Sequence, residues 1–152
     1  MIYEKLNHIQ KELKAPKNQR NNFGGYNYRS CEDILEGVKP LLDKYKCVLT
    51  LSDEIAMIGD DNYIVSTATL IDSEDSTQLD VQAYACEPIN QKGMSRPQMT
   101  GSASSYARKY ALNGLFCIDD SKDVDSMDNT KTEEPKKRRS RLNKTVDNDC
   151  PF

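Results

Sequence analysis

Hydroxyl, aromatic and basic side chains recur at helical spacing between Gln98 and Leu112. At 3.6 residues per turn, one face of a helix in this stretch holds Ser102, Ser105, Lys109 and Asn113, with Tyr106 at its rim. No acid occurs between Glu87 and Asp119. Such a face suits a phosphate backbone, which accepts hydrogen bonds and attracts positive charge. A solvated helix face would show the same pattern, so spacing alone leaves both interpretations open.

A second face of the same helix carries mostly small residues, namely Ala103, Ala107, Tyr110 and Gly114. Small side chains let a helix backbone approach a neighbouring sheet closely. We therefore expect this second face to pack inward and the hydroxyl face to point elsewhere.

Two tyrosines and an arginine follow the glycine pair Gly24-Gly25. Tyr26 and Tyr28 could stack on unpaired bases without demanding sequence, and Arg29 could hold a phosphate. The alternative is that both rings pack beneath the loop. The residues themselves do not decide between these interpretations.

These two regions together resemble the ERF family of phage single-strand annealing recombinases. One matching block holds Gly101-Ser102-Ala103, Ser105-Tyr106 and Arg108-Lys109-Tyr110 with Leu112, and the other holds Tyr26–Ser30, Glu32–Leu35 and Val38–Leu42. Two blocks in the expected order are more specific than either alone. The resemblance covers residues 1–120. It implies a β-β-β-α core like that of the eukaryotic annealing proteins, assembly into homo-oligomeric rings, a functional Arg29 and a phage exonuclease partner.

The distribution of charge agrees with DNA binding better than the net charge of −3 does. Nine acids and no Lys or Arg lie between Lys46 and Lys92, so the cations are segregated elsewhere. Local potential matters more than net charge for nucleic-acid binding. We assign Lys92, Arg96, Arg108 and Lys109 to a DNA groove, although each could also be a solvated surface charge.

Apolar periodicity predicts the elements that position these residues. Ile2, Leu6 and Ile9 predict an amphipathic helix over residues 2–14, and residues 16–27 are expected to form a flexible loop. Ser30 with Asp33 predicts a capping box for a helix that Pro40 should kink or split.

Alternating and β-branched residues predict strands over 47–52, 63–71 and 77–86, with residues 54–58 as a fourth strand if they extend separately. A basic loop over residues 88–97 leads to the helix of the first paragraph. The expected fold is α+β, with a three-stranded antiparallel meander packed with helices. Domain length predicts one folded unit, residues 1–120.

Residues 121–152 are expected to be a disordered tail, because acids, a basic block at 136–141 and few apolar residues dominate it. The tip at 147–152 resembles the acidic end of bacterial single-stranded DNA-binding proteins (SSB), which recruits repair and replication partners. Asp147, Asp149, Pro151 and Phe152 are its candidate partner-binding residues. A chance ending is the alternative.

Several chemistries lack the residues that they need. No glycine-rich phosphate loop with lysine is present, and a catalytic triad is not available around the single His8. The five cysteines form no CxxC pair, so we expect reduced thiols and no zinc. The aspartates after Ile118 suit a solvated linker better than a metal site. We expect no catalytic residue, metal or cofactor.

The leading hypothesis is therefore a non-enzymatic protein that binds single-stranded DNA and anneals complementary strands without ATP in phage recombination. The alternative is a passive SSB-type protein, which the tail alone favours. Neither a signal peptide nor a membrane-spanning stretch is recognisable, so we expect a soluble protein of the bacterial host cytoplasm.

Overall fold

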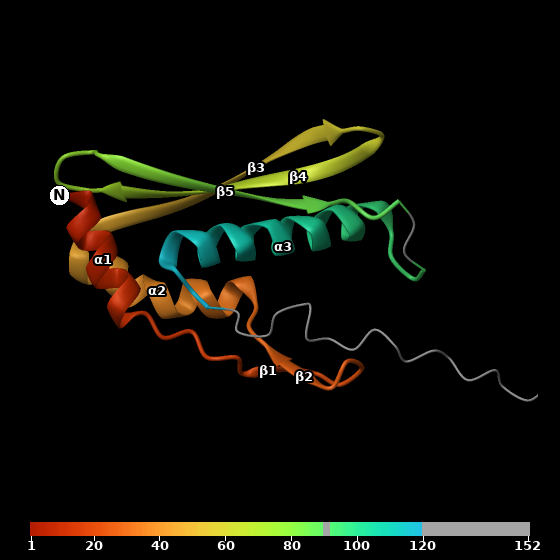
Figure 1. Ribbon diagram of the computed structural model, residues 1–152, viewed down its shortest axis with the longest axis horizontal. Coiled ribbons are helices and arrows are strands. Elements are labelled where there is room, and N and C mark those ends of the chain that lie inside the picture. The colour runs from red at the N-terminus through yellow and green to blue at the C-terminus, as the bar shows by residue number, and fades with distance from the viewer. Residues whose placement is uncertain (90–91, 120–152) are drawn as a thin grey trace, which may run out of the picture. The chain divides into compact units, whose positions relative to one another are not determined.

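A three-stranded antiparallel sheet with strand order β3–β4–β5 forms one layer of the fold (Figure 1). The computed structural model describes residues 1–89 and 92–119. In it the strands are β3 (Cys47–Ile58), β4 (Asp61–Asp72) and β5 (Gln78–Cys86). Gly59 has a φ of +63° in the tight turn between β3 and β4, where glycine avoids the strain of a side chain. The predicted α+β class and three-stranded meander are confirmed.

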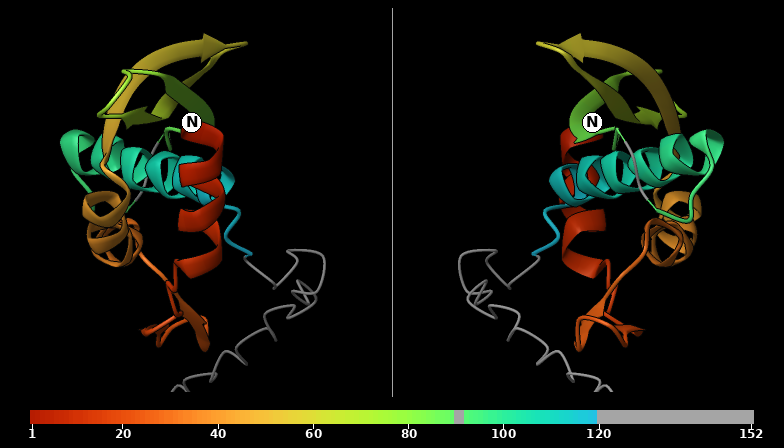
Figure 2. Two further views of the ribbon diagram at one scale, coloured as in Figure 1. Left: turned by 90° about the vertical axis from the view of Figure 1, so that its left-hand side faces the viewer. Right: turned by 90° about the vertical axis from the view of Figure 1, so that its right-hand side faces the viewer.

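Three helices lie on one face of this sheet, as Figures 1 and 2 show: α1 (Ile2–Glu12), α2 (Cys31–Tyr45) and α3 (Arg96–Phe116). α3 packs directly on β4 and β5. The largest fully buried side chains include Ile9, Ile34, Leu70, Leu112 and Phe116, which come from all three helices and β4. Burial of each such side chain contributes about 1.5–3 kcal/mol. None of the helices in the described segments is both long and apolar enough to cross a membrane.

Side-chain alternation in β5 follows the predicted pattern. Leu79 and Val81 point to the helix layer and are partly buried, whereas Asp80 and Tyr84 are exposed. β3 differs from its prediction, because it continues through Glu54 to Ile58 and pairs with β4 along its whole length. Residues 54–58 are therefore the distal half of one long strand and not a fourth strand.

The predicted capping box at the start of α2 is confirmed. Ser30 Oγ accepts a hydrogen bond from the backbone N–H of Asp33 at 3.2 Å, and Asp33 Oδ2 accepts one from the N–H of Ser30 at 2.8 Å. These bonds hold the pKa of Asp33 below its usual range, the backbone N–H of Ser30 being the stronger cause. The predicted split at Pro40 is wrong, because α2 runs unbroken from Cys31 to Tyr45 with Pro40 on its exposed side.

Residues 16–27, predicted to be a flexible loop, contain a short hairpin instead. Its strands are β1 (Gln19–Asn21) and β2 (Tyr26–Tyr28), which pair antiparallel with Asn21 opposite Tyr26. The hairpin lies on the side of α3 opposite the sheet (Figures 1 and 2). Its three-residue strands are too short for alternation to show in the sequence.

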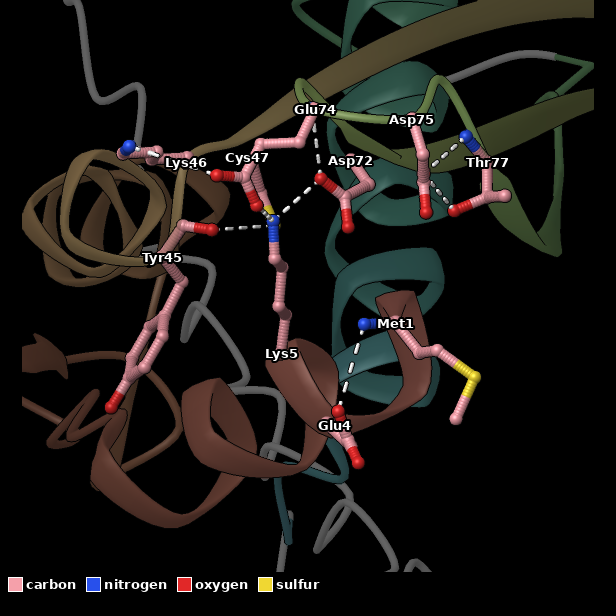
Figure 3. Close-up of polar contacts among 10 residues, drawn as sticks. All are labelled: Met1, Glu4, Lys5, Tyr45, Lys46, Cys47, Asp72, Glu74, Asp75 and Thr77. Carbon is pink, nitrogen blue, oxygen red and sulfur yellow. Dashed lines mark hydrogen bonds and ion pairs between the residues drawn. The ribbon is translucent and has the colours of Figure 1, made fainter.

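A buried carboxylate fastens α1 to the end of the sheet, as Figure 3 shows. Lys5 Nζ donates to Asp72 Oδ1 at 2.5 Å and to Glu74 Oε2 at 2.7 Å, and the N–H of Glu74 donates to Asp72 at 3.0 Å. The residue Asp72 is only 1% exposed. The bond from Lys5 is the main cause that lowers the pKa of Asp72, and the same contact raises the pKa of Lys5.

Replacing Asp72 by asparagine should lower the thermal unfolding midpoint at pH 7 by several degrees. The pKa of the Asp72 carboxyl is lower in the folded protein than in the unfolded chain. The ionised carboxyl therefore stabilises the folded protein at pH values above its pKa in the unfolded chain, and this stabilisation is lost as the pH falls. The gap between wild type and variant should therefore narrow from about pH 5 towards about pH 2. Calorimetry across this pH range measures the difference between the unfolding midpoints of wild type and variant. The control is Asp80→Asn, which removes the charge of an exposed aspartate. A gap independent of pH would contradict this role.

Candidate nucleic-acid interface

α3 begins with a capping box and presents small residues to the sheet. Ser95 pairs with Gln98, and no acid lies in the first turn. Ala103 and Ala107 are buried on the sheet side. A Cβ added at Gly114 would lie 3.0 Å from Val81 Cγ1 on β5, so the helix sits as near the strand as glycine allows. This small-residue packing agrees with the prediction, and it leaves the opposite side of the first half of α3 exposed.

The exposed side of α3 brings a cation between two tyrosine rings. Lys109 Nζ lies 4.9 Å from the ring centroid of Tyr106 and 4.9 Å from that of Tyr110. The rings are 52% and 46% exposed, with centroids 6.3 Å apart. We call Tyr106, Lys109 and Tyr110 the tyrosine–lysine cluster. An ammonium group held in this way can contact a phosphate, and partly exposed tyrosine rings can stack on bases.

Serines extend this surface towards the start of the helix. Ser105 is exposed and Ser102 is partly exposed, one turn and two turns before Lys109. Their hydroxyl groups can donate to phosphate oxygens. Of the face predicted from the sequence, Asn113 departs because it is only 9% exposed. The predicted packing face included Tyr110, which instead belongs to the exposed surface.

Arg108, the neighbour of Lys109, has a different environment. Its Nε lies 3.1 and 3.0 Å from the two carboxylate oxygens of Asp53, and its Nη2 lies 2.8 Å from Oδ2. Asp53 also accepts hydrogen bonds of 2.6 Å from Ser66 on β4 and 2.6 Å from Ser104 on α3. Burial opposes the charge of Asp53, but these donors outweigh it and lower its pKa. The guanidinium of Arg108 is thus engaged within the fold.

Arg29 is also turned into the protein. Arg29 is 8% exposed, and its two Nη atoms each donate a hydrogen bond of 3.3 Å to the backbone carbonyl of Asp119. Tyr26 and Tyr28 form an edge-to-face pair with centroids 6.4 Å apart. The hydroxyl of Tyr26 accepts a hydrogen bond from Asn21 at 3.1 Å, whereas Tyr28 is 38% exposed. Of these three, Tyr28 is the most accessible to a ligand.

Arg96 lies apart from the tyrosine–lysine cluster, in the first turn of α3. It lines an open hollow of about 460 Å³ together with the acids Asp60, Asp61 and Glu87. Because three carboxylates and one guanidinium line this hollow, its charge does not favour binding of a phosphate. Lys92 lies in the exposed loop before the helix. The structure therefore does not bring the four predicted cations onto one surface.

Two features that the fold creates have no counterpart among the sequence-based expectations. Asp53 serves as the partner of Arg108, and Phe23 is fully exposed at the hairpin turn. The tyrosine–lysine cluster does have a sequence signal, because Tyr106, Lys109 and Tyr110 are spaced i, i+3 and i+4. Asp147, Asp149, Pro151 and Phe152, with the basic block at 136–141, lie outside the described residues.

The four cysteines in the described part of the chain are free. Cys31 and Cys47 are buried, and burial raises the pKa of both. Cys86 and Cys117 are exposed, and Cys150 lies outside the described residues. In the part of the chain that the structure describes, no group of three or more His, Cys, Asp or Glu side chains is arranged to hold a metal ion.

Comparison with known proteins gives a consistent family assignment. A family model described as the ERF superfamily matches residues 2–149. The chain is 58% identical over 125 residues to the protein named "Essential recombination function protein" of Salmonella phage P22. That match covers 82% of this chain and 59% of the phage P22 protein, so the chain spans about three fifths of its relative's length. No solved structure matches the chain.

Proposed function

The chain belongs to the ERF superfamily, and from this premise we propose that it acts in phage recombination by binding single-stranded DNA and annealing complementary strands. The name of its phage P22 relative, "Essential recombination function protein", supports the recombination role. The proposed activity is non-enzymatic and needs no nucleotide. Base pairing supplies the specificity and the free energy, while the protein aligns the strands and neutralises their charge.

The observation that carries this proposal is the tyrosine–lysine cluster on the exposed side of α3. A cation 4.9 Å from two ring centroids offers a phosphate contact next to two base-stacking faces. Single strands expose both groups at every nucleotide, which is why such a surface accepts any sequence. Ser102 and Ser105 add hydroxyl donors on the same side of the helix.

We also propose that the protein works as a homo-oligomer, with a ring as the expected form. One subunit offers few contacts, and repetition adds them along a strand. Exposed apolar side chains on the distal half of β3 support association, because Ile55 and Met57 are 72% and 75% exposed. β3 and β5 are the two outer strands of the described sheet, so both have unpaired edges there.

A passive SSB-type protein is the second candidate, and the resemblance of residues 147–152 to the acidic tip of such proteins favours it. Such proteins normally use an OB barrel of five strands. Residues 1–89 and 92–119 instead form a three-stranded sheet and a separate two-stranded hairpin. We propose that Asp147, Asp149, Pro151 and Phe152 recruit a repair or replication partner, and that a phage exonuclease supplies the single strands.

Mixing labelled complementary oligonucleotides with the full chain and no nucleotide should accelerate duplex formation. Binding should weaken steeply between roughly 50 and 200 mM salt, because each neutralised phosphate releases counterions. Fluorescence transfer between the two strands measures annealing, and anisotropy of one strand measures binding. Coating without faster pairing would favour the SSB-type alternative. Shortened strands would indicate a nuclease, and binding insensitive to salt would contradict a phosphate-contacting surface.

A further inference from the structure

Phe23 is the most exposed large apolar residue that the structure describes, with a relative exposure of 104%. It lies in the turn between β1 and β2. This hairpin lies on the side of α3 that faces away from the sheet (Figures 1 and 2). A fully solvated phenyl ring adds nothing to the core. The ring is therefore open to contact with a ligand.

The turn that carries Phe23 is held in one shape by side-chain contacts. Asn21 Oδ1 accepts hydrogen bonds from the N–H groups of Phe23 and Gly24, both at 3.0 Å. The N–H of Gly25 donates to the carbonyl of Asn21 at 2.8 Å, and Gly25 has a φ of +69°. These local bonds hold the backbone of the turn that carries Phe23.

Tyr26 supports the turn from beneath. A Cβ added at Gly24 would lie 2.4 Å from an atom of the Tyr26 ring, so the ring packs directly on the glycine backbone. The hydroxyl of Tyr26 accepts a hydrogen bond from the amide of Asn21, which also caps the turn. Tyr26 therefore stabilises the hairpin by packing on its turn, and the ring exposed to solvent at the turn is that of Phe23.

The charge around the hairpin suits a polyanion. No acid occurs between Glu12 and Glu32, while Lys14 and Arg20 within this interval are exposed. An aromatic tip on a hairpin that carries Arg20 and no acid of its own combines a stacking surface with phosphate attraction. Ala103 and Ala107 are buried on the sheet side of α3, so the tyrosine–lysine cluster lies on another side of that helix.

We propose that Phe23 is a base-stacking contact of the protein, inserted beside an unpaired base of single-stranded nucleic acid. This inference rests on the proposed function, since it names a second contact for the same ligand. The tyrosine–lysine cluster and the hairpin tip would then engage neighbouring nucleotides of one strand. The ring would keep a bound base separated from its neighbours and open to a complementary strand.

The chain contains no tryptophan, so Phe23→Trp introduces a unique fluorophore at the tip. Titrating the full-length variant with an oligothymidylate should quench its emission, because stacking places the base on the indole. Tyr84→Trp, at a 53% exposed position on the outer face of the sheet, is the matched control and should not be quenched. Anisotropy of the labelled oligothymidylate in the same samples reports binding independently.

Phe23→Ala should weaken oligothymidylate binding roughly 5- to 150-fold, the factor for loss of one base–aromatic stack. Phe23→Leu should lose nearly as much, because it keeps apolar area without a flat ring. Unquenched emission of the Phe23→Trp variant together with full binding would overturn the inference and leave the proposed function standing. Absence of binding by the wild-type chain would instead reject the proposed function. Altered assembly size of Phe23→Ala in sedimentation would assign the tip to a subunit contact and likewise overturn the inference.

Discussion

Replacing Tyr106 and Lys109 together by alanine should reduce the affinity for single-stranded DNA by at least roughly 10-fold. The change removes one stacking face and one phosphate contact from the exposed side of α3. In the wild type, Lys109 Nζ lies 4.9 Å from the ring centroid of Tyr106. Neither side chain is part of the buried core, so the free energy of unfolding should change by less than about 0.5 kcal/mol. Annealing should slow in parallel.

The control for this pair is Tyr84→Ala with Lys39→Ala, which removes the same side-chain types from exposed positions on β5 and α2. Anisotropy titrations at several salt concentrations separate the two contributions. Lys109→Ala alone should reduce the slope of log K against log salt by about one. Normal affinity and an unchanged slope in the folded double variant would remove α3 from the DNA-binding surface.

Arg108→Ala should act on stability, in contrast to its neighbour Lys109. It deprives the Asp53 carboxylate of its bidentate partner and leaves that group with the hydroxyls of Ser66 and Ser104. Hydrogen bonds to charged groups are worth about 1.5–3 kcal/mol. The guanidinium is itself partly exposed, so we expect the lower half of that range.

Urea unfolding of Arg108→Ala, Asp53→Ala and the double variant forms a cycle that isolates the coupling between the two groups. The double variant should lose less stability than the sum of the singles. Lys109→Ala is the matched control, because it removes a cation from the next position of the same helix. A stable Arg108→Ala protein with weakened DNA affinity would return Arg108 to the DNA-binding surface.

Local patterns are sufficient for most of the fold. Apolar spacing locates α1, the Ser30–Asp33 box locates the start of α2, and alternation locates β5. The distal half of β3 is not recognisable as its continuation, because Asp53 and Glu54 interrupt the apolar pattern there. Asp53 is tolerated in the strand because Arg108 lies against it, 55 positions away in the chain. A contact of that range leaves no trace in a local window.

The sequence predicts which helix carries the candidate site, but it does not predict which of its cations are free to contact DNA. Helical spacing identifies the exposed side of α3, but it cannot tell which of two consecutive cations is already paired. Arg108 and Lys109 differ by about 100° around the helix axis. That angle directs Arg108 to Asp53 and Lys109 to the tyrosines. The prediction that Tyr110 packs on the sheet is wrong, because Tyr110 is exposed. A helical wheel gives the angle of a side chain around the helix axis, but it does not show how far the sheet extends beneath the helix.

The close approach of Gly114 to Val81 constrains how members of this family can diverge. A side chain at position 114 would require Val81 or the helix to shift by a few tenths of an ångström unless position 81 became smaller, since only 3.0 Å separates an added Cβ from the valine methyl. The two positions are therefore expected to exchange volume in related sequences. The exposed side of α3 has no such restriction. One helix thus joins a face on which a change of volume is expected to need compensation in the sheet to an exposed face on which no such compensation is expected.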